Sequence, residues 1–520
     1  MEKETVRTAK LMHACRFSVD CKMFGAYCYL SEIRGTIPLL HGPVGCAFFP
    51  KLVPPDAIRT QLLGIGDPPA FPCTDMDERD IVYGGADKLR DAIIKVDNHY
   101  RPDLIGVIIS CPAAIIGDDV VDIVGSVRDR VHADIIHTPS SAGFADEERV
   151  ENMDRHAEDL INIWKNPDEK PKWGIETCGR LDTLYSLIEQ LVEAPVEKLE
   201  NTVNIDTYGR FHFFEDLAGE LIEIKTMLKN IGIGVNTVFP GCSVKAIKSM
   251  ARARLNVMRR SEKSAKFLKA KFGMDYIFDF FGNRYIGFEG ARQFYMDIAE
   301  RFDRQAEARE VLGARERDLQ HEIESIRREI KGKTIAYIST PIFTTPMFLT
   351  LLEMFGLEVK MLCINTHWWR RWGMSKQAMD PLIEQLKSEL KALKLNLCIH
   401  IDLTIDEEVE KIKQNEIDLT LGDVIVSDIA RTMYYENHGI NALSPHCLGY
   451  SSFRISFSQI ARLGRMIAAR LNRRVPDRNL LYFRYHYHPH RFPSLMSDVS
   501  DERKWEKIMQ QVWKKNDASG

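Results

Sequence analysis

The stretch Pro102–Val120, PDLIGVIISCPAAIIGDDV, predicts how this chain folds. Its first half is a short apolar run that ends at Ser110 and Cys111, and a turn and a helix start follow it. Short apolar runs of this kind are typical of strands that are buried on both faces of a parallel sheet. We therefore expect Cys111 at the carboxyl end of a buried strand, which is where doubly wound sheets bind their ligands.

The same alternation of apolar strand, turn and amphipathic helix continues along the chain. Further strands are expected in three series, at residues 133–140, at 202–209, 232–241, 253–258 and 274–282, and at 333–340, 357–366, 395–403 and 418–428. Helices are expected at 342–356, 375–393 and 453–472. This pattern predicts an α/β protein with three doubly wound, Rossmann-like domains that contain parallel sheets.

The expected domain limits follow from these series. They are 1–145 for an N-terminal α/β domain, 146–330 for a second α/β domain with long linking helices, 331–475 for a third α/β domain and 476–520 for a C-terminal extension. The charge-rich stretch 289–333 predicts one or two long surface helices between the second and third domains, and a coiled-coil surface for a partner is the alternative.

The composition narrows the classes of function. With 70 basic and 74 acidic residues the net charge is -4, which indicates neither nucleic acid nor an anionic membrane as a partner. No apolar run approaches the roughly 18 to 20 residues of a membrane span, and Met1–Lys10 lacks the apolar stretch of a signal peptide, so a cytoplasmic location is expected. Eleven cysteines, an odd number in a reducing compartment, argue against a disulfide framework.

Three cysteines are candidate ligands because of their positions: Cys21, Cys46 and Cys111. Cys46 ends the turn HGPVGC, where small residues let backbone amides approach a bulky anion such as a cluster sulfide. Iron-sulfur clusters take their cysteines from separated loops, and the close cysteine pairs of structural zinc sites are absent from the sequence. Taken singly, each of the three is better explained as a buried apolar residue.

Other residues are weaker candidates for a site. Cys28, like Cys15 and Cys73, is a thiol near the first three, and Cys242 follows an expected strand and starts a helix. KGKT at 331–334 is not a P-loop, because Arg327 stands where the motif requires its first glycine.

Longer motifs carry a family resemblance. The pattern C-x3-GA-x9-T-x-P-x2-HGPVGC at 21–46, then FPCTDMDERDIVYGGADKLRDAI at 71–93 and SCPAAIIGDDV at 110–120, resembles the N-terminal domain of the nitrogenase component 1 superfamily. The similarity continues through 253–282 and 332–341. The superfamily contains nitrogenase catalytic subunits, cofactor-assembly scaffolds, light-independent protochlorophyllide and chlorophyllide reductases, and nitrogenase-like reductases of sulfur compounds.

The resemblance implies a cofactor and partners. Members supply three cysteines per subunit to an interfacial iron-sulfur cluster, and these ligands fall on Cys21, Cys46 and Cys111. The implied cluster is a P-cluster-type eight-iron cluster or a [4Fe-4S] cluster, shared with a homologous α-type subunit in an α2β2 heterotetramer. A separate dimeric iron protein, which carries its own [4Fe-4S] cluster and hydrolyses ATP, would supply the electrons.

The resemblance also indicates the kind of subunit. Catalytic α-type subunits hold a second cofactor through a cysteine, but here the segment reads LNVMRRSEKS, with Arg260 close to the expected position. His446 is the nearest match to their cofactor histidine, although a histidine before a helix is commonly a cap or packing residue. We therefore expect a β-like subunit that relays electrons to a catalytic metallocluster in its partner, which reduces dinitrogen or a methylthio or other sulfur compound. The alternatives are a cofactor-assembly scaffold and a subunit of a tetrapyrrole reductase.

Overall fold

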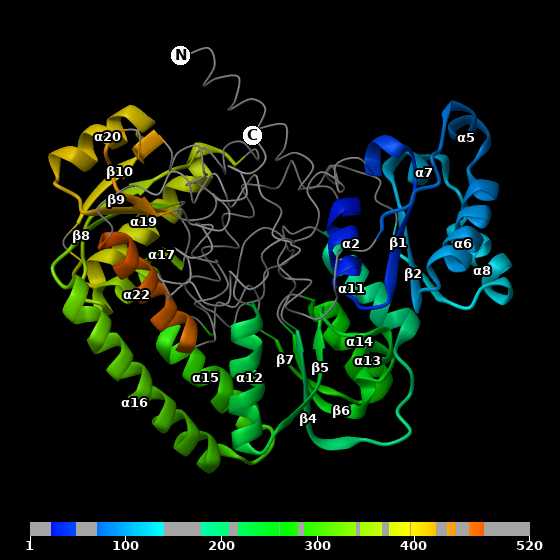
Figure 1. Ribbon diagram of the computed structural model, residues 1–520, viewed down its shortest axis with the longest axis horizontal. Helices are drawn as coiled ribbons and strands as arrows, with labels where there is room; N and C mark the ends of the chain where they lie inside the picture. Colours follow the sequence, from blue (N-terminus) through cyan, green and yellow to red (C-terminus); the bar gives the residue numbers. More distant parts are fainter. Residues whose placement is uncertain are drawn as a thin grey trace, which may run out of the picture.

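The computed structural model groups the strands of this chain into three separate sheets, and every strand pairing in them is parallel (Figure 1). This arrangement confirms the predicted α/β class with its three parallel-sheet units. The structure describes residues 22–47, 70–139, 178–206, 217–258, 261–278, 285, 287–339, 344–366, 374–395, 397–422, 434–436, 438–443 and 457–472.

The first sheet has the strand order β1-β2-β3 and carries helices on both faces. Leu104 and Ile108 of the middle strand pack against helices α2 and α11, whereas Ile105 and Val107 face helices α6 and α8 on the other side. The elements are α2 (Lys22–Ser31), β1 (Thr36–His41), α5 (Glu78–Tyr83), α6 (Ala86–Tyr100), β2 (Leu104–Ile109), α7 (Cys111–Ile116), α8 (Val120–Val127), the 3-10 turn η2 (Arg128–Arg130), β3 (Asp134–His137) and α11 (Cys178–Leu191).

The second sheet has the order β5-β4-β6-β7, so the direction in which strands are added reverses beside β4. Such a reversal is the feature that opens a crevice at the carboxyl ends of the strands. Its elements are β4 (Leu199–Asp206), α12 (Leu217–Ile231), β5 (Gly234–Phe239), α13 (Val244–Lys248), the 3-10 turn η3 (Met250–Arg252), β6 (Ala253–Met258), α14 (Glu262–Phe272), β7 (Asp275–Phe278), α15 (Gly287–Glu300) and α16 (Gln305–Ile330).

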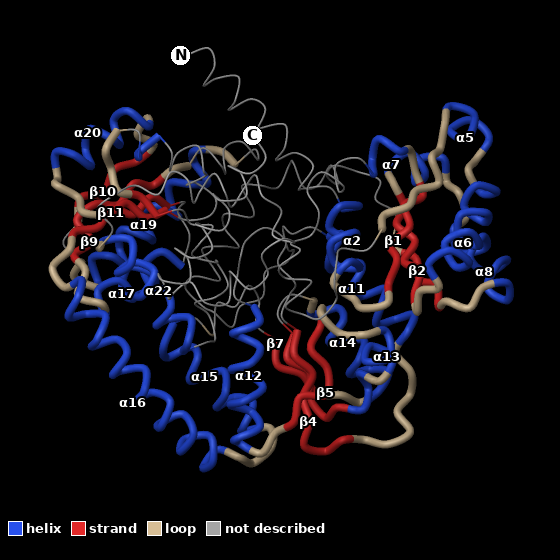
Figure 2. The backbone as a smooth tube through the Cα atoms, viewed as in Figure 1, coloured by secondary structure: helices blue, strands red, loops and turns tan. Residues whose placement is uncertain are grey.

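The third sheet has the order β10-β9-β8-β11-β12, with its reversal between β8 and β11. Its elements are β8 (Thr334–Ser339), α17 (Thr344–Met354), β9 (Glu358–Ile364), α19 (Lys376–Ala392), β10 (Cys398–Ile401), α20 (Ile405–Gln414), β11 (Leu419–Gly422), β12 (Ala442–Leu443) and α22 (Phe457–Leu471). Figure 2 shows this sheet and the first one on opposite sides of the molecule, with the second sheet between them at the lower edge.

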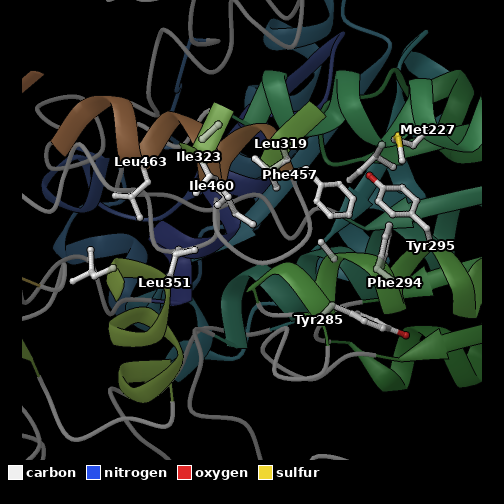
Figure 3. Close-up of a cluster of buried hydrophobic side chains, with 14 of the residues drawn as sticks. Met227, Tyr285, Phe294, Tyr295, Leu319, Ile323, Leu351, Phe457, Ile460 and Leu463 are labelled. Atoms are coloured by element: carbon white, nitrogen blue, oxygen red, sulfur yellow. The ribbon is translucent and has the colours of Figure 1, made fainter. Parts of the chain in front are cut away.

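The long helices α15 and α16 connect the second sheet to the third, as the charge-rich stretch predicts. The apolar side of α16 is buried against α12, α15 and α22, and its residues Leu319 and Ile323 lie in the same core as Phe457 (Figure 3). The carboxylate of Glu223 on α12 accepts hydrogen bonds from the backbone N–H groups of Phe457 and Ser458, at 2.8 and 2.9 Å. The apolar stripe of α16 is therefore covered from within the chain, which removes the reason for a coiled-coil partner there.

Two findings qualify the sequence predictions. Helix α11 packs against α2 and β3 of the first sheet, although it lies beyond the predicted limit of residue 145, and the predicted domain limits stay a prediction. KGKT connects the end of α16 to the start of β8, so it lies at the amino end of a strand, whereas a P-loop follows a strand. The predicted C-terminal extension lies outside the described residues.

None of the helices in the described ranges is both long and apolar enough to cross a membrane.

Candidate cluster-binding site

Cys46 and Cys111 follow two neighbouring strands of the first sheet. Strands β1 and β2 pair in parallel up to His41 and Ile109. Cys46 lies in the short helical turn after β1, and Cys111 is the first residue of α7, directly after β2. Since the carboxyl ends of parallel strands meet at one edge of a sheet, both cysteines belong to the same edge, where doubly wound folds bind ligands.

Backbone contacts fix these two segments against each other. The backbone N–H of Ser110 donates to the carbonyl oxygen of His41 at 3.0 Å, and the Ser110 hydroxyl caps α7 by accepting from the N–H of Ala113. A Cβ atom added to Gly42 would lie 2.3 Å from the Ser110 Oγ atom, so only glycine fits at that position. The motif HGPVGC thus needs its first glycine for the close approach of its turn to the segment that carries Cys111.

A third segment, residues 72–76, lies along the other side of β1. Leu40 donates its N–H to the carbonyl of Pro72 at 3.0 Å, and Thr74 donates its N–H to the carbonyl of Leu40 at 2.9 Å. Cys73, between them, packs with Cys46 against the hydrophobic cluster under α2. This places a third thiol beside the same strand, and Cys73 stays a weaker candidate ligand than Cys46 and Cys111.

A buried polar network also holds this edge together, and sequence reasoning missed it. His41 is fully buried; its Nδ1 atom lies 3.1 Å from Thr74 Oγ1, and its Nε2 atom lies 3.0 Å from Asp118 Oδ2. Thr74 Oγ1 also accepts a hydrogen bond from the N–H of Gly42 at 3.0 Å. The Asp118 carboxylate accepts the N–H of Gly85, the residue that precedes α6, at 3.0 and 3.1 Å.

The environment of His41 favours the neutral ring. Burial lowers its pKa below the ordinary value of 6.5, and the opposing effects of the nearby Asp118 and Asp80 carboxylates are smaller. The motifs HGPVGC and IGDD contain His41 and Asp118, so a short-motif search could have found them as a pair. Thr74 had no local signal, because a threonine between two strands is an ordinary residue.

The cysteines differ in exposure. Cys46 and Cys111 are partly exposed, whereas Cys28 is fully buried in the core under α2. Cys242 is buried after β5, and burial raises the pKa of its thiol to about 12. Partial exposure at a strand end suits a ligand that must reach a bound group, while the two buried thiols lie inside a hydrophobic cluster.

The two candidate ligands that the structure describes, Cys46 and Cys111, fit an iron-sulfur cluster. Both are thiols, the ligands such clusters take, and they come from separate loops at one sheet edge. A Cβ atom added to Gly45 would meet nothing within 4 Å, so there is open space beside Cys46. Cys21, Arg260 and His446 lie outside the described residues, and within the described part no three metal-binding side chains gather at one point.

Comparison with protein families gives a match over most of the chain. The sequence model described as "Nitrogenase component 1 type Oxidoreductase" matches residues 21–472. The match begins at Cys21 and ends at the last residue of the segment that contains α22, and it confirms the resemblance carried by the motifs.

Curated relatives come from several branches. The chain is 25% identical over 336 residues to the nitrogenase molybdenum-iron protein alpha chain of Methanosarcina barkeri, which covers 63% of this chain and 56% of that protein. It is 24% identical over 330 residues to the nitrogenase iron-molybdenum cofactor biosynthesis protein NifE of Methanococcus maripaludis, covering 62% and 59%. It is 26% identical over 258 residues to one subunit of the light-independent protochlorophyllide reductase of Heliobacterium modesticaldum, covering 48% and 42%. The chain therefore matches less than two thirds of the length of each of these relatives.

A solved structure shares the fold. The structure described as "Nitrogenase Cp1 at pH 5" superposes with a TM-score of 0.57 over 87% of this chain and 88% of that chain, at 17% sequence identity. At this identity the likeness shows the fold alone.

Proposed function

Because the chain belongs to the nitrogenase component 1 type oxidoreductases, we propose that it is a β-like subunit of a nitrogenase-like two-component reductase. In this proposal Cys21, Cys46 and Cys111 hold one side of an iron-sulfur cluster, of the eight-iron or the [4Fe-4S] kind, that is shared with a homologous α-type subunit in an α2β2 assembly. A dimeric ATP-hydrolysing iron protein supplies electrons, and dinitrogen or a methylthio compound is reduced at a metallocluster held by the partner subunit.

The observation that supports this most directly is the placement of Cys46 and Cys111 after two adjacent parallel strands. When bound, an iron-sulfur cluster takes up and releases single electrons. The chain itself contributes thiolate ligands on segments that are held rigidly, since Ser110 bonds to His41 and caps α7. Rigid ligands keep the surroundings of a bound group constant between its oxidised and reduced forms.

An exposed apolar patch beside these cysteines suits the docking of the iron protein. Helix α5 buries none of its residues, and its side chains Ile81, Val82 and Tyr83 are 46, 69 and 84% exposed. It packs against α7, the helix that begins with Cys111 (Figure 1). Ile115 of α7 is 80% exposed. Contiguous exposed apolar side chains mark interaction sites, and an electron donor must approach the ligand residues closely.

The helix in this patch is held in place without burial. The Asp77 side chain caps α5 in a capping box with Asp80, and the Lys88 ammonium lies 3.2 Å from Asp77 and 2.6 Å from Asp80. These contacts fix the backbone of a short helix that presents its apolar residues outward. The arrangement is understandable if α5 is covered only in a complex.

A cofactor-assembly scaffold is the second candidate, because NifE of Methanococcus maripaludis matches this chain nearly as well as the nitrogenase alpha chain does. The β-like role itself rests on the lack of a cysteine in the segment 255–264. A reductase would consume substrate when iron protein and ATP are added, whereas a scaffold would pass a bound metal cofactor to a cofactor-free enzyme. Reduction of a tetrapyrrole in the same assay would favour the third candidate.

The ligand assignment is tested by anaerobic purification of the chain with the subunit encoded beside it. Iron, sulfide and the electron paramagnetic resonance (EPR) spectrum would be compared for wild type, Cys46→Ala and Cys398→Ala. Cys398 is an exposed cysteine on β10 of the third sheet and serves as the matched control. We expect Cys46→Ala to lose the cluster signal and Cys398→Ala to keep it, and an unchanged signal in Cys46→Ala would refute the assignment.

The docking patch is tested with Tyr83→Lys, which places a charge on its most exposed apolar side chain. We expect weaker binding of the iron protein and slower ATP-dependent substrate reduction, with the cluster spectrum unchanged. Val196→Lys is the matched control, since Val196 is likewise an exposed apolar residue but precedes β4 of the second sheet. Equal binding of the iron protein by both variants would exclude α5 from the docking surface, and reduction without any iron protein would exclude a two-component mechanism.

A further inference from the structure

The network of Thr74, His41 and Asp118 lies between the segments that carry Cys46 and Cys111. Thr74 bonds to the backbone at the start of the Cys46 turn, and Asp118 follows α7, the helix that begins with Cys111. His41 joins the two, with one ring nitrogen toward each. Its position between the segments suggests a role that reaches beyond packing.

The direction of each hydrogen bond follows from the partners. The Asp118 carboxylate only accepts, so the Nε2 atom of His41 carries the proton and donates to it. Because burial favours the neutral ring, the Nδ1 atom is then bare and accepts from the Thr74 hydroxyl at 3.1 Å, which is closer than the other acceptor, the Gly42 carbonyl oxygen at 3.4 Å. That leaves the Thr74 oxygen to accept the N–H of Gly42, so one directed chain runs from the Cys46 turn to Asp118.

We propose that Thr74, His41 and Asp118 are positioning residues, which hold the Cys46 turn against the Cys111 helix and, through the Asp118 charge, set the reduction potential of the group bound there. This inference rests on the proposed function. Glycines pack tightly against this hydrogen-bonded network and leave its side chains little freedom to move. A Cβ atom added to Gly85 would lie 2.9 Å from a ring carbon of His41. A shift of any one member would therefore be transmitted to the ligand segments.

Within the network, the charge of Asp118 is what would affect the reduction potential of the bound group. Its side chain is 7% exposed, so the carboxylate lies in a poorly solvated place where its charge is weakly screened. A buried negative charge disfavours the addition of an electron nearby. Asp118→Asn keeps the shape of the side chain, removes the charge, and is expected to shift the midpoint potential to more positive values.

The positioning role is tested at Thr74. Thr74→Val keeps the volume and removes the hydroxyl, while Thr74→Ser keeps the hydroxyl and removes a methyl group. In the purified complex we expect faster amide hydrogen exchange in the peptide 40–47 and a partial loss of iron for Thr74→Val, with both restored in Thr74→Ser. Thr226→Val is the matched control, because Thr226 on α12 loses one side-chain hydrogen bond far from the site.

The outcomes separate this inference from the proposed function. If the wild-type complex binds an interfacial cluster, and both Thr74→Val and Asp118→Asn leave its midpoint potential and the exchange of peptide 40–47 unchanged, the inference is overturned and the proposed function stands. If the wild-type complex holds no such cluster, the proposed function fails. The exchange comparison of Thr74→Val with Thr74→Ser still decides whether the network positions the turn. Should Thr74→Val not fold, Asp118→Asn carries the test alone through the potential.

Discussion

Two cysteines of this chain follow the carboxyl ends of strands in two different sheets, one a middle strand and the other an edge strand, and their surroundings differ. Cys111 follows β2 of the first sheet and Cys242 follows β5 of the second, and each is next to a serine that caps the next helix. In the first case the order is Ser110 then Cys111, and in the second it is Cys242 then Ser243. The first thiol is partly exposed and the second is buried.

The difference teaches that the position relative to the helix cap decides what a strand-end cysteine can do. Cys242 precedes the cap, where an apolar side chain packs back onto the fourth residue of the helix. That residue is Ile247, and both belong to one hydrophobic cluster. Cys111 is the first residue of its helix, after the cap, and its side chain is partly exposed.

The largest expected difference between Cys111 and Cys242 is in their effect on bound iron. Cys111→Ser should remove the interfacial iron from the purified complex, because serine replaces a thiolate ligand of an iron-sulfur group. Cys242→Ser should leave the iron per complex unchanged. Metal analysis with EPR checks both, and equal loss of iron in the two variants would mean that exposure does not separate ligands from packing residues.

The next effect is on thiol reactivity in the iron-free protein. Raising the pKa of Cys242 from 9.0 to about 12 leaves about 1,000-fold less thiolate at neutral pH, and burial slows the reagent further. Cys111 should therefore be alkylated by iodoacetamide far sooner than Cys242, as followed by mass spectrometry of the peptides. Similar rates for the two would contradict the buried position of Cys242.

A smaller effect concerns stability. Cys242→Ser places a hydroxyl among apolar side chains and should lower the free energy of local opening around α13 by about 1–3 kcal/mol. Cys111→Ser should change it by less than about 0.5 kcal/mol, because the side chain is partly exposed. Hydrogen exchange of the peptide 236–250 measures the first and that of 107–118 the second; Cys242→Ala, which adds no polar atom, is the control.

The smallest effect is a pH dependence of the free energy of opening at His41, beside the Cys46 turn of the first sheet. The lowered pKa of His41 means that the opened chain binds a proton near pH 6.5 and the folded chain does not, so acid favours opening. The free energy of opening of peptide 40–47 should fall by at most about 1.4 kcal/mol for one pH unit below 6.5. In His41→Gln this loss should vanish, and hydrogen exchange at pH 7.5 and 5.5, corrected for the intrinsic rate, checks it. The Asp118 carboxylate, which bonds to the ring, and the charge of Asp80 both raise the pKa of His41 and so reduce the size of the effect.

Much of the fold was predictable because buried strands of parallel sheets leave continuous apolar runs. The run before Cys111 became β2, and the stretch 253–258 became β6 with the same bounds. Strand β1 was not predicted, since Pro38 interrupts a short run and argues against a central strand. The structure tolerates Pro38 because β1 has only β2 as a neighbouring strand in the described sheet.

The candidate site was predictable only in its local parts. The apolar run placed Cys111 at a strand end, and the structure puts the Cys46 turn at the neighbouring strand. The contacts of His41 with Thr74 and Asp118 join residues 33 and 77 positions apart; motifs mark His41 and Asp118 as residues of interest, but no local pattern shows that they touch or that Thr74 joins them. Long-range contacts of this kind depend on strand order, which apolar periodicity does not determine.

The carboxylate of Glu223 has a consequence for how the second and third sheet regions can be separated. The first backbone amides of α22 are satisfied by a side chain that is more than 200 positions earlier and belongs to the helix layer of another sheet. A fragment that begins at residue 331 would keep every described strand of the third sheet but would leave the start of α22 without that acceptor. The helix layer of the third sheet is thus completed by a side chain from the second, so the two regions share the start of α22.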